Sequence, residues 1–315
     1  MITIFLKVLV IFLMVAAGFI AGRTNALPQS AVKPLVDLLL YITCPCMILS
    51  SMAKVTMSET LFHQSIQVLT GSVFYFIVMG LFAWGLIKLM HYQPAEDAGV
   101  FMVLVTAVNT GFMGFPVTRS IFGDYFLILM VLENVVLNLY LYIMAPVQMN
   151  YGHKAKDADR KHPLLAMINM CTIACVAGLV ILFLQIPMPE VLLDFSTTVG
   201  DATVPVSMIV VGVQLAGSSL TRVLSDWRLL LGSALNLLLV PVLTFLAVNW
   251  LPLYDEVKVI LIFAACFPCA VITVGVAQRE GRNTSFLAEG VALTTALSMA
   301  TLPLAAWFLT AYYGL

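Results

Sequence analysis

The chain has 315 residues, of which 62% are hydrophobic and 10% are charged, and its formal net charge is −1. A soluble domain carries roughly 25% charged residues, and its core could not bury this much apolar surface. The composition therefore excludes a soluble domain and predicts an all-α protein that crosses the lipid bilayer several times. The net charge also excludes a basic protein that binds nucleic acid.

Ten apolar segments of the sequence are each near the length of about 20 residues that a helix needs to cross the hydrocarbon core. The first segment lacks the basic n-region of a signal peptide, so we expect it to be retained as a membrane helix. In chain order, the segments are residues 4–22, 34–53, 66–89, 98–121, 125–148, 164–184, 197–216, 228–250, 256–279 and 285–312.

The distribution of lysine and arginine predicts how these spans are oriented. The connections that follow spans 1, 3, 5, 7 and 9 carry eleven of the fifteen Lys and Arg residues, and the opposite side carries four. Because cytoplasmic loops are enriched in Lys and Arg, we expect the central connection, residues 150–162, to be cytoplasmic. With an even number of spans, both termini should then be extracytoplasmic.

The two halves of the chain resemble each other at an offset of 160 residues, which pairs Gly18 with Gly178 and Pro45 with Pro205. Each half has five spans, so the second copy must enter the membrane inverted relative to the first. Inverted repeats with interrupted helices in matching positions are typical of secondary transporters. We therefore expect a first repeat, a loop and a second repeat at residues 1–149, 150–162 and 163–315.

The fourth and ninth spans contain residues that interrupt helices. Span 4 contains Asn109-Thr110-Gly111-Phe112-Met113-Gly114-Phe115-Pro116, and Pro268 lies about midway along span 9. Lipid cannot hydrogen-bond an exposed backbone, so such breaks are tolerated only where protein or a water-filled cavity covers them. We expect both spans to unwind near the bilayer midplane, around residues 109–116 and 266–273. The expected helix breakers across the chain are Pro45, Gly114, Pro116 and Pro205.

Several polar side chains inside the spans are candidates for function. Asn109 and Thr110 could contact an anion, or they could only cap the broken helix, and the two roles are compatible. Glu133 lies within span 5, where a carboxyl group is costly and could carry a proton. Its alternative role is a structural hydrogen bond to a neighbour such as Asn134 or Asn138.

The sequence motifs distinguish three classes of function. A secondary transporter of small organic anions agrees with the paired breaks, whereas an anion channel would more usually show a filter loop or charged rings. An intramembrane enzyme would need a catalytic motif, and His-Glu-x-x-His, Gly-x-Ser-x-Gly and Gly-x-Gly-Asp are all absent. The six cysteines lie in spans without a histidine nearby, so we expect no metal and no cofactor. Coupling to protons or sodium stays open, as does a homodimer packed through Gly18 and Gly22.

The motif Asn109-Thr110-x-x-Met113-Gly114-x-Pro116, followed by Gly123, resembles the fourth-span signature of the auxin efflux carrier family. The C-terminal part is similar too, through Pro268, Leu302-Pro303 and the closing Tyr312-Tyr313-Gly314-Leu315. The resemblance covers essentially the whole chain. The short central loop resembles that of bacterial permeases for malonate, malate and similar acids rather than that of plant carriers.

This resemblance implies a fold in which spans 4 and 9 cross as broken helices. A transport domain of spans 3–5 and 8–10 would move against a scaffold of spans 1, 2, 6 and 7. The expected substrate is a carboxylate or dicarboxylate such as malonate, malate or an auxin-like acid, carried by alternating access across a bacterial inner (plasma) membrane. The residues expected to bind it are Asn109, Thr110, Gly111, Phe267, Pro268 and Thr273, with Glu133 as the candidate for coupling.

Overall fold

The computed structural model describes residues 2–151, 170–217 and 226–315. All regular elements in these ranges are helices, which confirms the prediction of an all-α membrane protein. Most of the predicted central loop and the first part of the predicted sixth span lie outside the described residues. Within the described ranges, seven helical segments are long and apolar enough to cross a membrane: Gln29–Lys54, Glu59–Met90, Ala95–Phe122, Asp124–Met149, Glu190–Gly217, Trp227–Asn249 and Thr284–Tyr313.

The first half of the chain contains the longest helix, α4, which begins where the Ser58 side chain accepts a hydrogen bond from the Leu61 amide. It ends at His91, which adopts a left-handed conformation. The elements of this half are α1 (Ile2–Arg23), η1 (Gln29–Ala31), α2 (Val32–Leu38), η2 (Leu39–Thr43), α3 (Cys44–Lys54), α4 (Glu59–Met90), η3 (Ala95–Asp97), α5 (Ala98–Thr106), η4 (Thr110–Gly114), α6 (Phe115–Phe122), α7 (Asp124–Leu139), η5 (Tyr140–Met144) and α8 (Ala145–Met149).

The second half ends in another long helix, α18, whose first turn is capped by the Asn283 side chain. The described elements of this half are α10 (Met170–Leu184), α11 (Glu190–Asp201), α12 (Thr203–Gly217), α14 (Trp227–Ala234), η6 (Leu235–Leu239), α15 (Val240–Asn249), α16 (Asp255–Ala265), α17 (Ile272–Arg279) and α18 (Thr284–Tyr313).

Four prolines of this chain follow wide, π-helical turns. Each of the π turns η2, η4, η5 and η6 is followed by a helix with proline at its first or second position. Proline has no N–H and its ring clashes with the carbonyl four residues earlier, so a wide turn gives the ring room. Pro45 therefore follows a widened turn within a continuous helical segment, and Pro205 follows the turn at Ala202 that separates α11 from α12.

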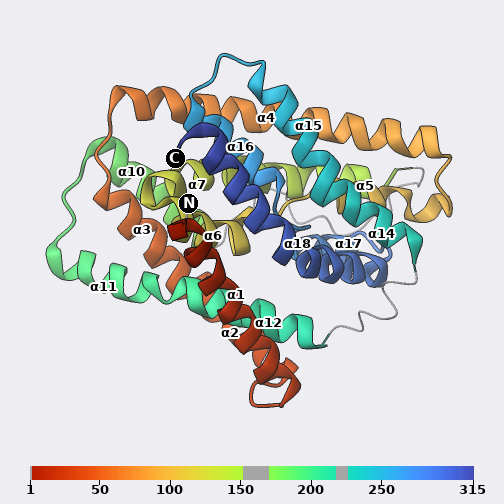
Figure 1. The fold of residues 1–315 in the computed structure, drawn as a ribbon, viewed down its shortest axis with the longest axis horizontal. Helices are drawn as coiled ribbons and strands as arrows, with labels where there is room; N and C mark the ends of the chain where they lie inside the picture. Colours follow the sequence, from red (N-terminus) through yellow and green to blue (C-terminus); the bar gives the residue numbers. More distant parts are fainter. Residues whose placement is uncertain (1, 152–169, 218–225) are drawn as a thin grey trace.

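The helices can be described as two groups, which also contact each other, most of all through α3 and α7. In one, α1 packs along α12, and α3 packs against α10 and α11 (Figure 1). In the other, α4 contacts α5, α7 and α16, while α18 contacts α14, α16 and α17. Figure 1 shows α3, α10 and α11 gathered on the left and α5 and α14 on the right, with α4 crossing the top.

The pairing of α1 with α12 depends on glycine. A Cβ atom on Gly18 would overlap the backbone of Ile209, and one on Gly212 would overlap the carbonyl of Val15. The Gly22 position is also close to Ala216. The Gly18-x-x-x-Gly22 face is therefore used for packing within the chain.

Candidate transport site

The helical segment that corresponds to predicted span 4 is interrupted. Helix α5 ends at Thr106, Ala107 is extended, and the chain resumes as the wide turn η4 and then as α6. The interruption therefore covers residues 107–109 and not the predicted 109–116, because Thr110–Gly114 is already a wide helical turn. Pro116 follows this turn in the first turn of α6 without a break, so neither Gly114 nor Pro116 interrupts the helix.

The segment that corresponds to predicted span 9 is interrupted between α16 and α17, over residues 266–271. The two interruptions touch each other, because the Asn109 amide donates a hydrogen bond of 2.8 Å to the Pro268 carbonyl. Cys269 is held from a third helix, since its amide donates to Thr294 Oγ1 of α18 at 3.3 Å. Backbone groups released by one break are therefore partly satisfied by the other break and by a side chain.

A cavity of about 400 Å³ lies beside these breaks. Its lining comes from both groups of helices, and among the described residues none of those that line it is Asp, Glu, Lys, Arg or His. The polar lining residues are Asn109, Asn134, Asn138, Tyr142, Thr172, Thr203, Ser207 and Gln214. The others include Val36, Leu39, Leu40, Val108, Phe112, Phe115, Leu137, Leu141 and Ile272.

The structure separates the predicted binding residues into two sets. Asn109 and Gly111 line the cavity. The other four, Thr110, Phe267, Pro268 and Thr273, are not among its lining residues. Thr110, Phe267 and Thr273 have no exposed surface.

The cavity residues not predicted from the sequence include Thr203, Ser207 and Gln214 of α12, and Asn134 and Asn138 of α7. A signal was present, because side chains spaced four residues apart share one face of a helix. Asn134 and Asn138 have this spacing, as do Thr203 and Ser207.

The two cavity-lining asparagines of α7 are hydrogen-bonded to each other and to the wide turn η4 that follows the interruption of span 4. Asn138 Nδ2 donates to the Asn134 carbonyl at 2.9 Å and to Asn134 Oδ1 at 3.0 Å. Asn134 Nδ2 in turn donates to Thr110 Oγ1 at 3.0 Å. Glu133 is 1% exposed, and neither of its carboxyl oxygens has a hydrogen-bond partner among the described residues.

Polar contacts join the last turn of α6 and the first turn of α7 to α3 and α11. Arg119 Nε donates to Asp124 Oδ1 at 2.8 Å, and Arg119 Nη1 donates to Asp201 Oδ1 at 2.8 Å. Ser51 of α3 donates to the same Asp124 oxygen at 2.6 Å. The Arg119 side chain is 13% exposed, so this network is largely shielded from solvent.

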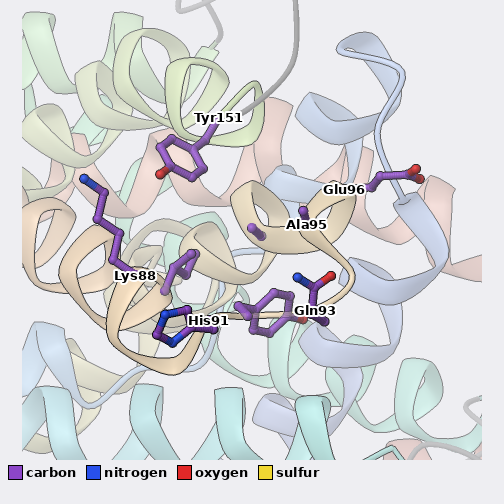
Figure 2. A pocket seen from close by; sticks show the side chains of 9 residues that line it. Lys88, His91, Gln93, Ala95, Glu96 and Tyr151 are labelled. Carbon is purple, nitrogen blue, oxygen red and sulfur yellow. The ribbon is translucent and has the colours of Figure 1, made fainter.

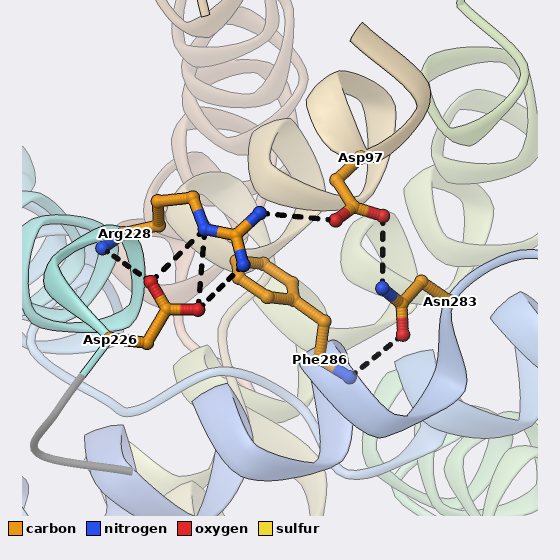
Figure 3. Close-up of polar contacts among 5 residues, drawn as sticks. All are labelled: Asp97, Asp226, Arg228, Asn283 and Phe286. Atoms are coloured by element: carbon orange, nitrogen blue, oxygen red, sulfur yellow. Dashed lines mark hydrogen bonds and ion pairs between the residues drawn. The ribbon is translucent and has the colours of Figure 1, made fainter. Parts of the chain in front are cut away.

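A second polar cluster joins the starts of α5, α14 and α18 (Figure 3). Arg228 binds Asp226 through two nitrogens and contacts Asp97 Oδ2 at 3.3 Å. Asn283 Nδ2 donates to Asp97 Oδ1 at 3.0 Å and caps α18 by accepting from the Phe286 amide. Hydrogen bonds from Arg228 hold the pKa of Asp226 below its usual range. This cluster is a structural tie between helix ends.

Figure 2 shows another hollow, of about 520 Å³, at the connection between α4 and α5. Lys88, His91, Gln93 and Glu96 line it, with Tyr151 on the opposite side. It contains none of the predicted site residues, and its one lining residue from α5, Ala98, lies at the start of that helix and not at the interruption. The cavity beside Asn109 is therefore the better candidate for a transported solute.

A neutral, partly polar cavity beside two interrupted helices, within a protein of many apolar spans, defines a membrane transporter. Sequence comparison agrees, because residues 3–306 match the family described as "Membrane transport protein". The chain belongs to this family, which includes the auxin efflux carriers and is a family of transporters rather than enzymes.

A similar protein is "Uncharacterized transporter MJ1031" of Methanocaldococcus jannaschii. It is 23% identical to this chain over 309 residues, which cover 96% of this chain and 97% of the relative. The similarity therefore extends over nearly the full length of both proteins.

Proposed function

We propose that this protein is a secondary transporter that moves a small organic anion across a membrane by alternating access. The observation that carries the proposal is the hydrogen bond from the Asn109 amide to the Pro268 carbonyl, beside a cavity of about 400 Å³. Interrupted helices that meet at membrane depth offer backbone groups and helix ends to a solute.

The proposed architecture has ten spans in two inverted repeats, residues 1–149 and 163–315, joined by the loop 150–162. The helix contacts support it, since α1 pairs with α12 in the same way that α10 pairs with α3. In both pairs, the first span of one repeat packs against the second span of the other repeat. Helices α1 and α12 belong to spans 1 and 7, and helices α10 and α3 belong to spans 6 and 2. Spans 1, 2, 6 and 7 would form the scaffold, and spans 3–5 and 8–10 the moving domain.

The cavity lining favours an anion with a single charge. An asparagine amide and the N-terminal end of α17, at Ile272, can stabilise one carboxylate without a cation. No Lys, Arg or His of the described part of the chain lines the cavity, so a second charge would lack a compensating partner there, and an unpaired buried charge is costly. An auxin-like monocarboxylate therefore fits better than malonate or malate.

Glu133 is the proposed coupling residue, with a proton as the coupled ion. It is buried without a regular hydrogen bond, and a neutral carboxyl group in apolar surroundings is much less costly than a carboxylate. The proposed location is a bacterial inner membrane, with residues 150–162 in the cytoplasm and both termini outside, according to the positive-inside rule.

The proposal is tested by thermal unfolding of the purified protein with a panel of singly and doubly charged carboxylates. A ligand that binds the native state at 100 times its Kd stabilises the protein by about 2.7 kcal/mol. We expect singly charged members such as benzoate to raise the unfolding temperature more than malonate or malate. No stabilisation by any member, together with no carboxylate uptake in proteoliposomes, would refute the proposal.

A further inference from the structure

Among the described residues, two polar contacts join the two groups of helices. Arg119 Nη1 of α6 donates to Asp201 Oδ1 of α11 at 2.8 Å. Ser51 Oγ of α3 donates to Asp124 Oδ1 of α7 at 2.6 Å. The Arg119–Asp124 pair, at 2.8 Å, connects these contacts into one cluster. No other hydrogen bond or ion pair between described residues crosses from α1–α3 and α10–α12 to α4–α8 and α14–α18.

The cluster lies beyond the cavity along every helical segment that carries it. In chain order, the four segments place their cavity residues within 36–44, 108–115, 134–142 and 203–214, and their cluster residues are Ser51, Arg119, Asp124 and Asp201. Asp124 begins the segment Asp124–Met149, whose other end leads to the central connection. The cluster therefore lies at the end of these segments away from the central connection.

We propose that Ser51, Arg119, Asp124 and Asp201 form a latch, which must open before a solute can reach the cavity from the end away from the central connection. Alternating access exposes a central site to one side of the membrane at a time, through the movement of one bundle of helices against the other. Because the latch joins the two groups at this end, they cannot separate there while it is closed. This inference rests on the proposed alternating access.

The arrangement of charges lets the latch open without leaving a buried charge alone. Arg119 and Asp124 lie on consecutive helices of the same group, so their pair can persist when the groups separate. The Asp201 side chain is 59% exposed, so water can replace Arg119 around its carboxylate. Breaking a buried ion pair is costly because it leaves an uncompensated charge, and neither Arg119 nor Asp201 would be left in that position. The latch is therefore a contact that can break and form again in each transport cycle.

Ser51 provides the position at which opening is measured. It has no exposed surface, and its hydroxyl group contacts Asp124 of the other group, so separation of the groups at the latch would expose it. Ser51→Cys places a thiol there with little change in size, in a full-length chain whose six natural cysteines are replaced by alanine. The rate of labelling by a charged methanethiosulfonate reagent then reports how often this position opens, because a buried thiol reacts only when the structure opens locally.

In this background, Asp201→Ala should speed the labelling of Ser51→Cys by about two- to fivefold, the effect expected for loss of a partly exposed ion pair. Asp201→Glu keeps the carboxylate and should restore the original rate. Raising the NaCl concentration from about 0.05 M to about 0.5 M screens the same pair, so it should also speed labelling while all the other latch residues are intact. This second measurement serves if Asp201→Ala does not fold.

Two controls separate the latch from a general loosening of the protein. The Asp255 side chain is 63% exposed and pairs with Lys258 of the same helix at 3.2 Å, so Asp255→Ala removes a similar pair within one group. It should leave the labelling rate of Ser51→Cys unchanged. Ser233→Cys places a reporter thiol at a fully buried position of α14. Its labelling rate should not respond to Asp201→Ala.

The outcomes separate this inference from the proposed function. An unchanged labelling rate of Ser51→Cys in Asp201→Ala would overturn the latch, and so would an equal acceleration at Ser233→Cys. No labelling of Ser51→Cys in any variant would overturn it too, because the groups would then not separate at this position. The labelling needs no solute, so these results leave anion transport intact. Failure of every carboxylate in the panel to bind the wild-type protein would instead refute the proposed function itself, whatever the labelling rates.

Discussion

At the scale of single residues, Asn109 links the backbone of one interrupted helix to the cavity. Its amide is fixed by the Pro268 carbonyl, and its side chain has no hydrogen bond to a described residue while it lines the cavity. A side chain held in place by its backbone, with its own polar atoms free, is prepared to bind a solute at little entropic cost.

Asn109→Ala should therefore weaken carboxylate binding by about 1–3 kcal/mol, the usual contribution of a hydrogen bond to a charged group. The backbone hydrogen bond to Pro268 does not depend on the side chain, so the unfolding temperature without ligand should change little. Isothermal titration with the best carboxylate of the panel, on wild-type protein and variant, measures this difference. An unchanged Kd in a folded variant would remove Asn109 from the binding site.

At the scale of elements, the α1–α12 contact requires the absence of side chains at Gly18 and Gly212. Gly18→Ala would place a methyl group against the Ile209 backbone, which cannot move aside as a flexible side chain can. We expect a loss of about 1–3 kcal/mol in stability, as for other overpacked sites. Chemical unfolding in detergent measures it.

Gly85→Ala is the matched control for this substitution. A Cβ atom at Gly85 of α4 would have no neighbour within 4 Å, and alanine favours a helix over glycine by about 1 kcal/mol. This variant should be neutral or slightly more stable than the wild-type protein. Equal effects of the two substitutions would mean that the close packing of α1 on α12 contributes nothing to stability.

At the scale of the whole molecule, Arg119 joins the two groups of helices. It pairs with Asp124 of α7 and with Asp201 of α11, and both contacts measure 2.8 Å. Arg119→Gln would leave the partly buried Asp124 carboxylate without its cation. We expect it to destabilise the protein by about 3 kcal/mol, whereas Glu59→Gln, in an exposed pair with His63, should cost less than about 1 kcal/mol. Thermal unfolding of both variants tests this contrast.

The sequence predicted the helical class and the interruption of span 9, which lies at residues 266–271, because proline carries a local conformational preference. For span 4 it predicted an interruption over residues 109–116, whereas the chain is irregular over 107–109 and helical from Thr110, because the wide turn η4 accommodates Pro116 without a break. Contacts between distant segments, such as Gly18 with Ile209, depend on packing that no local pattern contains.

In the described part of the chain, no charged side chain lines the cavity, and this has a consequence for how transport responds to the membrane voltage. The charge that moves with the proposed carrier is then the charge of its cargo plus that of Glu133. With a monoanion bound and Glu133 protonated, the loaded carrier moves one negative charge, and with Glu133 ionised the empty carrier returns with one negative charge. Moving one such charge through a potential of 100 mV changes the free energy by about 2.3 kcal/mol. The loaded and the empty carrier move this charge in opposite directions, so the two free-energy changes cancel over a full cycle. Accumulation of the anion would then follow the pH gradient and not the voltage.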